Sequence, residues 1–308
     1  MSLARIIGYE SLNKHLFVFA KMLNPPLSHL PDDLLVSIVE QLAKLPFADD
    51  DLNNLSLTDR AFTQSCQNYI FRNLVLGKGT NIFKQLIKVK RFLDDKPLLA
   101  DRVRKVQLSI SSEESEWLFM DPNFISILQL FAKSPMPPHE LHFSGLMRTT
   151  IKHPRLVVRQ FGESFFSQTL TILRFREIGN VPLPLFLICP RLREVFLDRV
   201  GATDKSYDKY PDNQCFGREA PQLEVFNYCN SHSLVEQMIA PPPRFTTPVI
   251  LWSNLRVLTL APDDNGGMAC LQPILDASCN TLEELYLTGI GMAMGGSKRG
   301  IFDNTNQI

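Results

Sequence analysis

Apolar residues recur at helical spacing through most of the first hundred residues. Behind Pro31, five apolar residues predict a helix of about 12 residues: Leu34, Leu35, Ile38, Val39 and Leu42. A proline suits the first turn because it lacks only a donor that would stay unpaired there. The same spacing predicts helices over 52–57, 59–71 and 81–95, and Asp59 is suited to cap the second of these. The predicted apolar face of helix 81–95 comprises Ile82, Phe83, Leu86, Ile87, Val89 and Phe92.

After residue 100 the pattern changes to a recurring segment L-x-x-Φ-x-Φ, in which Φ is a large apolar residue. Its copies are Val103/Val106/Leu108, Leu170/Leu173/Phe175, Leu192/Val195/Leu197, Leu223/Phe226/Tyr228, Leu255/Leu258/Leu260 and Leu282/Leu285/Leu287. A weaker copy, Leu141/Phe143, lies between the first two. The copies return about every 30 residues, a period typical of proteins built from stacked repeats.

Each copy predicts one short strand whose alternate residues point inward, followed by a returning segment. Apolar residues at helical spacing fill the returning segments over 124–131, 183–188, 234–239 and 268–275. One such unit cannot bury its own apolar face, so successive units must stack. The sequence therefore predicts an α/β (α+β) chain, in which a helical module precedes an irregular solenoid of short parallel strands and helices.

The charge balance narrows the classes of partner. Lys+Arg and Asp+Glu each total 32 in the 308 residues, which gives a formal net charge of +0. Proteins held on nucleic acid or anionic lipid usually carry surplus Lys and Arg, so we expect neither partner. The basic run over 88–91 falls inside a predicted helix and is interpreted as a solvated face. No stretch approaches the roughly 18 to 20 apolar residues that span a bilayer, and no membrane association is expected.

The six cysteines show no C-x-x-C spacing, so the sequence predicts no zinc site. They are also too few for a secreted disulfide scaffold of this length. Buried cysteines in a reducing compartment are expected, which favours the cytoplasm or nucleus.

Candidate catalytic and ligand-binding motifs are weak. His139 and His142 stand three apart, so in a strand they would point to opposite faces and could not share a metal ion; we expect surface or loop histidines. The glycine-rich segment 289–298 has the spacing of a phosphate loop, but Ser297-Lys298 reverses the required order, and a flexible exit from the last repeat is expected. No nucleophile and base share a recognisable local signature. The sequence thus predicts no enzyme, no catalytic residue, no metal and no cofactor.

Residues 29–76 resemble the F-box motif of large families of fungal F-box proteins. Leu30-Pro31-x-x-Leu34-Leu35-x-x-Ile38 is similar to the motif's opening, L-P-x-E-L-x-x-x-I. Residues 55–62 are similar to its centre, and residues 69–76 to its close, L-F-R-x-V-x-L. Thr58 and Asp59 stand where Val and Cys are usual, and Asp33 stands where Glu is usual.

The resemblance implies an N-terminal three-helix F-box followed by a leucine-rich-repeat-like solenoid. The implied modules are an extension (1–28), the F-box (29–76), a linking helix (77–100), the solenoid (101–290) and a flexible tail (291–308). Such a protein is the substrate-recognition subunit of a Skp–cullin–F-box ubiquitin ligase: the F-box binds a Skp-family adaptor, which joins a cullin, and the repeats hold a protein target. The implied adaptor-binding residues are Leu30, Pro31, Leu34, Leu35, Ile38, Leu57, Arg60 and Phe62.

Two questions stay open at this point. The F-box could instead be degenerate, which would make the protein a ligase-independent interaction scaffold. Charged positions in and beside the predicted strands are either target contacts or solvated charges. They are Arg174, Arg193, Glu194, Glu224, Arg256, Glu283 and Glu284.

Overall fold

The computed structural model describes residues 30–45, 48–77, 81–111, 116–202, 219–240, 248–261 and 271–287. These residues form two compact units, a helical unit over residues 30–71 and a sheet unit over residues 72–287. The predicted extension 1–28, the glycine-rich segment 289–298 and the predicted tail 291–308 lie outside the described residues.

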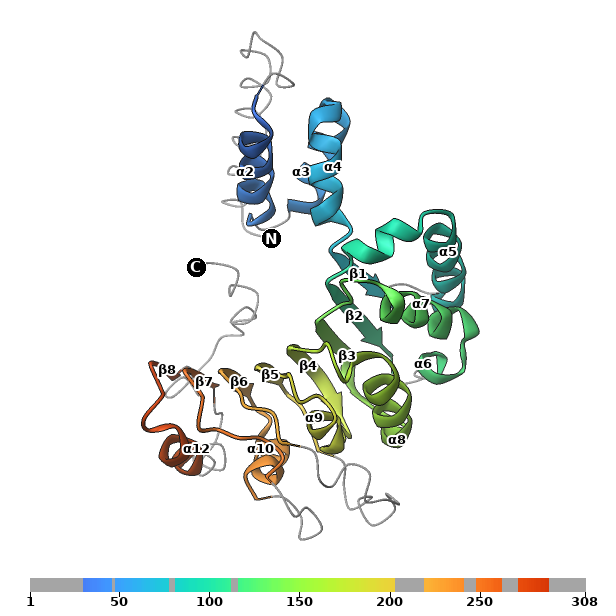
Figure 1. Ribbon diagram of the computed structural model, residues 1–308. Coiled ribbons are helices and arrows are strands. Elements are labelled where there is room, and N and C mark those ends of the chain that lie inside the picture. Colours follow the sequence, from blue (N-terminus) through green and yellow to red (C-terminus); the bar gives the residue numbers. More distant parts are fainter. Residues whose placement is uncertain are drawn as a thin grey trace. The chain divides into compact units, whose positions relative to one another are not determined.

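The described part of the helical unit contains three helices, α2 (Asp32–Ala43), α3 (Ala48–Thr58) and α4 (Arg60–Ile70) (Figure 1). All three were predicted, and α2 has the expected length of 12 residues. α3 begins four residues before the predicted start at residue 52. Asp59 caps α4 as predicted, because its Oδ1 accepts a hydrogen bond of 2.9 Å from the backbone N–H of Ala61. Asp59 departs from the F-box pattern, but its carboxylate has a hydrogen-bond partner in the structure.

Buried side chains from all three helices form the core of this unit. They are Leu35, Val39, Leu42, Ala48, Leu52, Phe62 and Cys66. Leu35, Val39 and Leu42 stand at positions i, i+4 and i+7 of α2, so they form one stripe along it. The helical unit thus has its own apolar core.

Cys66 lies in this core, and its side chain is 0% exposed. Burial raises the pKa of its thiol to about 11, so very little thiolate forms near neutral pH. At pH 8 we expect iodoacetamide to modify Cys66 at least about 100-fold more slowly than in the unfolded chain, because two pKa units lower the thiolate fraction by about that factor. Exposed Cys279 is the internal control, and tryptic mass spectrometry measures both sites. Equal rates in native protein and in urea would contradict a buried Cys66.

The sheet unit is built on one parallel sheet. Among the described residues its strands are β1 (Asn73–Leu76), β2 (Lys105–Ile110), β3 (Glu140–Thr150), β4 (Ile172–Gly179), β5 (Glu194–Asp198), β6 (Val225–Cys229), β7 (Val257–Ala261) and β8 (Glu284–Leu287). They lie side by side in sequence order, β1 to β8, and each neighbouring pair is parallel. This order is the one that stacked strand-and-return units produce.

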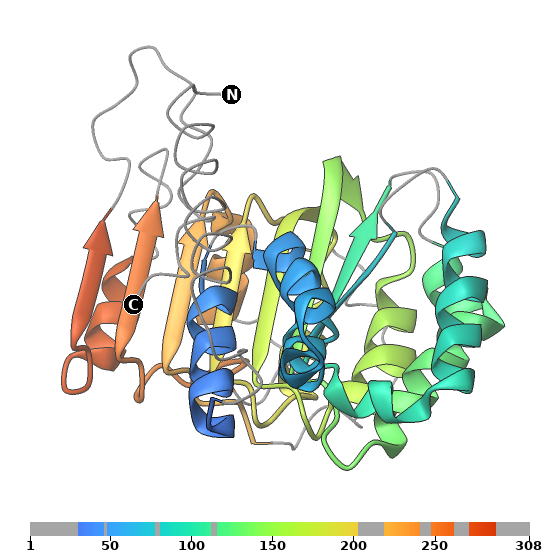
Figure 2. The ribbon, with the colours of Figure 1, turned by 90° about the horizontal axis from the view of Figure 1, so that it is seen from above.

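Described helices lie in every connection between neighbouring strands except the one from β5 to β6. They are α5 (Ile82–Asp95), the 3-10 helix η2 (Pro97–Arg102), α6 (Trp117–Met120), α7 (Pro122–Lys133), α8 (Pro154–Leu156), the π-helix η3 (Val157–Phe166), α9 (Pro184–Leu187), α10 (His232–Ile239) and α12 (Leu271–Ser278). Seen together, Figures 1 and 2 show the labelled helices of the sheet unit on one face of its sheet. The opposite face, called the open face below, carries none of them.

Two rows of apolar residues run across the strands on the helix-covered face. Residues paired strand by strand form the first row: Leu74, Val106, Leu141, Leu173, Val195, Phe226, Leu258 and Leu285. The second row is Leu76, Leu108, Phe143, Phe175, Leu197, Tyr228, Leu260 and Leu287. The predicted copies from Val106 to Leu287 are therefore confirmed as strands, and equivalent residues of successive copies are paired.

The last described strand differs from the others in burial. Leu258 and Leu260 on β7 are 0% and 1% exposed. Their partners on β8, Leu285 and Leu287, are 43% and 46% exposed. The apolar residues of both rows are therefore much more exposed on β8 than on β7.

β1 was not predicted. The sequence indicates for residues 73–76 only the close of the F-box motif, yet in the structure they pair with residues 105–108 of β2. Gly77 then leaves β1 with a φ of +85°, and a Cβ there would lie 2.0 Å from the carbonyl oxygen of Ser109. Only glycine fits this close approach.

The prediction for the apolar face of α5 was partly wrong. The structure buries Ile82, Leu86 and Leu93. Phe83 and Ile87 are instead 50% and 40% exposed. Only a narrow stripe of α5 is buried against the rest of the sheet unit. The apolar residues of α5 cover a wider part of its surface, so the sequence pattern does not show which of them are buried.

Candidate protein-interaction sites

The helix α2 carries a second apolar stripe beside its buried one. Pro31, Leu34 and Ile38 stand at positions i, i+3 and i+7, so they fall on one side of the helix. Leu34 is 51% exposed and Ile38 is 39% exposed, and Pro31 is exposed as well. Large apolar side chains left at the surface in this way are typical of a binding face for another protein.

The structure divides the eight predicted adaptor-binding residues by their burial. Leu35 and Phe62 are 4% and 1% exposed and belong to the core of the helical unit. Leu30 is partly buried against the same core. Leu57, near the end of α3, is 85% exposed, and Arg60 at the start of α4 is exposed.

One surface residue of α2 was not predicted. Val36 is 40% exposed and stands two positions after Leu34, which turns it to a different side of the helix. An apolar residue outside the buried i, i+4, i+7 pattern is the signal that could have identified it.

Most residues on the open face of the sheet are polar or charged. On β2 to β5, those between the buried positions include Lys105, Gln107, Glu140, His142, Arg174, Arg176, Glu194 and Asp198. Apolar residues also lie in these rows, namely Ile172, Phe196, Val225 and Val257. The row continues on later strands as Asn227, Thr259 and Tyr286. This face therefore differs in chemistry from the apolar face under the helices.

A charged cluster crosses β2, β3, β4 and β5 on the open face. The Glu140 carboxylate lies 3.1 Å from Lys105 Nζ and 2.9 Å from Arg174 Nε. The Arg174 guanidinium also stacks 3.6 Å from the ring centroid of Phe196, a cation–π contact. The two strands beside β4 thus hold Arg174 in place, β3 through Glu140 and β5 through Phe196.

His142 lies inside this cluster, so the prediction of a surface or loop histidine was wrong for it. Burial above all, together with the cations Lys105, Arg174 and Arg176, lowers the pKa of His142 to about 4, although nearby Glu140 acts in the opposite direction. Its buried Nδ1 has no hydrogen-bond partner among the described residues. His142 is therefore neutral at physiological pH.

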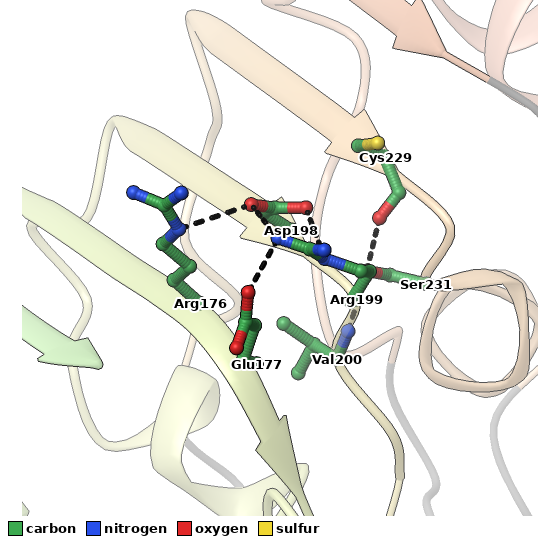
Figure 3. A network of polar contacts seen from close by, with 7 residues as sticks. All are labelled: Arg176, Glu177, Asp198, Arg199, Val200, Cys229 and Ser231. Atoms are coloured by element: carbon green, nitrogen blue, oxygen red, sulfur yellow. Dashed lines mark hydrogen bonds and ion pairs between the residues drawn. The ribbon is translucent and has the colours of Figure 1, made fainter. Parts of the chain in front are cut away.

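A second network lies where β4 and β5 end (Figure 3). Asp198 is 8% exposed. Its carboxylate forms ion pairs with Arg176 Nε at 3.4 Å and with Arg199 Nε at 3.2 Å. Arg199 also reaches Glu177 at 2.6 Å. The positive charges of two arginines and the negative charges of two carboxylates thus neutralise one another in this network.

The backbone turns sharply at this end of the sheet. Glu177, Arg199 and Asn230 have φ values of 55°, 55° and 47°, and they directly follow the paired residues Arg176, Asp198 and Cys229. A left-handed residue other than glycine costs about 1 kcal/mol, so such positions need support.

Ser231 supplies part of this support. It is 1% exposed, its hydroxyl donates to the carbonyl oxygen of Cys229 at 2.8 Å, and it accepts from the N–H of Val200 at 2.9 Å. The Arg199 N–H donates to the same carbonyl oxygen at 2.8 Å. These bonds join the ends of β5 and β6.

The sequence left open whether seven charged residues contact a target or are only solvated. Four of these residues form two ion pairs with one another. Arg193 forms an ion pair with Glu224, and Arg256 binds Glu283 through two hydrogen bonds of 2.8 and 2.7 Å. Exposed pairs of this kind contribute little to stability. A target that used these four side chains would have to replace contacts that they already make.

Two other kinds of feature are absent from the described residues. No group of three His, Cys, Asp or Glu side chains there could hold a metal ion. No helix in the described part of the protein is both long and apolar enough to cross a membrane. The exposed stripe of α2 and the open face of the sheet thus stand as the candidate sites, and both suit macromolecular contact.

Comparison with protein-family models, with curated proteins and with solved structures found no match to this protein.

Proposed function

We propose that the protein is the substrate-recognition subunit of a Skp–cullin–F-box ubiquitin ligase. In this proposal the helical unit is a three-helix F-box, and the sheet unit is a leucine-rich-repeat-like solenoid that holds a protein target. The protein performs no bond chemistry. It holds a target lysine at high effective concentration near the ubiquitin-conjugating enzyme, in the cytoplasm or nucleus.

One observation carries the proposal. The exposed stripe of Pro31, Leu34 and Ile38 belongs to the segment that resembles the opening of the F-box, and it is not used by the core of the helical unit. A helix that packs one stripe into its own core and presents another to solvent suits a docking helix. The order of the modules in the sequence, helices first and strand-and-return units behind, agrees with it.

The test is co-purification with a fungal Skp-family adaptor. We expect wild-type protein to form a one-to-one complex, and Leu34→Asp with Ile38→Asp to weaken it by about 30-fold or more, since truncated interface anchors cost about 2 kcal/mol or more. Circular dichroism and thermal melting should change little, because both side chains are exposed. Binding is measured by calorimetry.

Val36→Asp is the matched control, since Val36 lies on the same helix, is 40% exposed and points to a different side. It should keep the complex. Undiminished adaptor binding by the folded double variant would contradict the proposed docking stripe. A folded wild-type protein that forms no adaptor complex would favour the ligase-independent scaffold.

A further inference from the structure

The helix α5 has a mixed apolar and basic surface on its outer side, opposite its buried stripe. On the inner side it contacts β1, η2 and α7, and its buried residues are Ile82, Leu86 and Leu93. Figures 1 and 2 show α5 on the outside of the helix layer, at the end of the sheet that begins with β1. Phe83 and Ile87, one turn apart, are 50% and 40% exposed. Two large apolar side chains are therefore left side by side at the surface.

Three cations lie beside this apolar pair. Lys84, Lys88 and Arg91 fall on the side of the helix opposite the buried stripe, and all three are exposed. None of the three forms an ion pair with a residue that the structure describes. Their charges are therefore free to meet a partner.

The carboxylates of α5 do not neutralise this surface. Asp94 is already paired with Lys90. Asp95, the last residue of the helix, lies about 10 Å along the axis from Lys88. Residues 81–96 hold five cations and two carboxylates, in a chain whose formal net charge is +0. The outer side of α5 is thus a positive surface with an apolar centre, and it complements an acidic partner.

The inner side of α5 is tied firmly to the sheet. Gln85 Oε1 accepts a hydrogen bond of 2.9 Å from the N–H of Gly77, and its Nε2 donates to the carbonyl oxygen of Val75 at 3.0 Å. Asn81 caps the helix, because its Oδ1 accepts from the N–H of Lys84 at 2.9 Å. A surface carried on a fixed helix loses little freedom when a partner binds.

The backbone of α5 restricts the kind of partner that fits. Its N–H and C=O groups are used within the helix, so an extended peptide cannot add to it as a strand. A partner must satisfy its own backbone groups, as a helix does, and side chains four apart on α5 form the ridge against which a second helix packs.

Two other occupants fit this surface poorly. A second copy of α5 would bring three cations against three cations. A helix that binds a membrane buries its apolar face in the lipid, whereas the main apolar stripe of α5 is already packed inside the sheet unit.

We propose that the outer side of α5 binds an acidic amphipathic helix of another protein. The apolar side chains of that helix pack against Phe83 and Ile87, and its Asp or Glu side chains face Lys84, Lys88 and Arg91. The 14 residues of α5 extend over about 20 Å, which matches a partner helix of about four turns. This docking surface belongs to the sheet unit and does not depend on adaptor binding.

The test uses a displayed library of 18-residue, alanine-based helical peptides whose variable positions are Ala, Leu, Glu or Lys, selected against the full-length protein. We expect the selected peptides to carry Leu at positions three and four apart, flanked by Glu. Replacing every Glu of such a peptide by Gln should weaken binding about tenfold, as expected for the loss of a few exposed ion pairs. Fluorescence anisotropy measures the affinity, which should also fall as NaCl is added.

Variants decide whether α5 is the receptor. Lys84→Glu with Lys88→Glu should weaken binding of the acidic peptide at least about tenfold and should gain binding of a peptide in which Lys replaces Glu. Phe83→Ala should weaken binding of both peptide forms, because it removes the apolar anchor. Arg159→Glu with Arg191→Glu is the matched control: it makes the same change in charge at exposed cations of other segments of the sheet unit, and it should bind as wild type does. Thermal melting separates loss of binding from loss of fold.

Equal binding of the acidic peptide by wild type and the folded double lysine variant would overturn the inference. A selection that yields no binder, or binders without an excess of Glu, would overturn it as well. Phosphatidylserine vesicles are the second probe, and vesicle binding that is lost in the lysine variant, with no peptide selected, would assign the surface to a membrane instead. The adaptor is absent from these measurements, so a failed adaptor complex would contradict the ligase role alone.

Discussion

Leu260→Ala is expected to lower the free energy of unfolding by about 2 to 5 kcal/mol, and Leu287→Ala to lower it much less. The two leucines are paired on neighbouring strands and belong to the same row of the sheet. Leu260 is 1% exposed and Leu287 is 46% exposed. Truncation of Leu260 leaves a cavity between the sheet and its helices, whereas the site of Leu287 is already open to water.

Urea unfolding followed by circular dichroism measures both changes. Residue type, row and strand position are matched, so the difference between the two variants reports the difference in burial. An equal loss of stability in the two variants would contradict the exposure of β8. A loss below about 1 kcal/mol for Leu260→Ala would contradict its place in the core.

Acid should destabilise the protein between pH 6.5 and pH 4, with His142 contributing up to about 3 kcal/mol of the loss. In the unfolded state His142 takes up a proton near pH 6.5, whereas in the folded protein its pKa is lowered to about 4. Between these values the unfolded state holds more protons, so the free energy of unfolding falls as the pH is lowered. This loss is absent above about pH 6.5 and is complete below about pH 4.

The measurement compares wild type with His142→Asn at a series of pH values. The stability difference between them should shrink or reverse in favour of the variant as the pH falls from 6.5 to 4. Glu194, whose pKa is raised by burial, is present in both proteins and does not contribute to the difference. His153→Gln, a change at an exposed histidine, is the control and should give a constant difference. A constant difference for His142→Asn as well would refute its burial as a neutral group.

The strands could be predicted because burial imposes a strict period on them. Each copy of L-x-x-Φ-x-Φ fixes which residues face the helices, and the pairing of Val106, Leu141 and Leu173 follows that assignment. β1 escaped prediction because its four residues also complete the F-box motif, and they were assigned to the close of that motif and to no strand. One short apolar run is compatible with both interpretations, and only the pairing with β2 decides between them.

The candidate sites were less accessible to sequence reasoning. Helical spacing marks Leu34 and Leu35 alike as apolar positions of α2, yet one is 51% exposed and the other 4%. That difference depends on where α3 and α4 pack.

The order of the strands has a consequence for how the sheet unit comes apart. Every strand pairs only with the strands before and after it in the sequence, and the described end at β8 has the least buried apolar surface. Loss of β8 would expose β7 without disturbing β2 to β5, so opening can proceed from that end one strand at a time. The charged clusters on β2 to β5 lie several strands away from the fraying end, and their geometry should therefore outlast partial opening of the molecule.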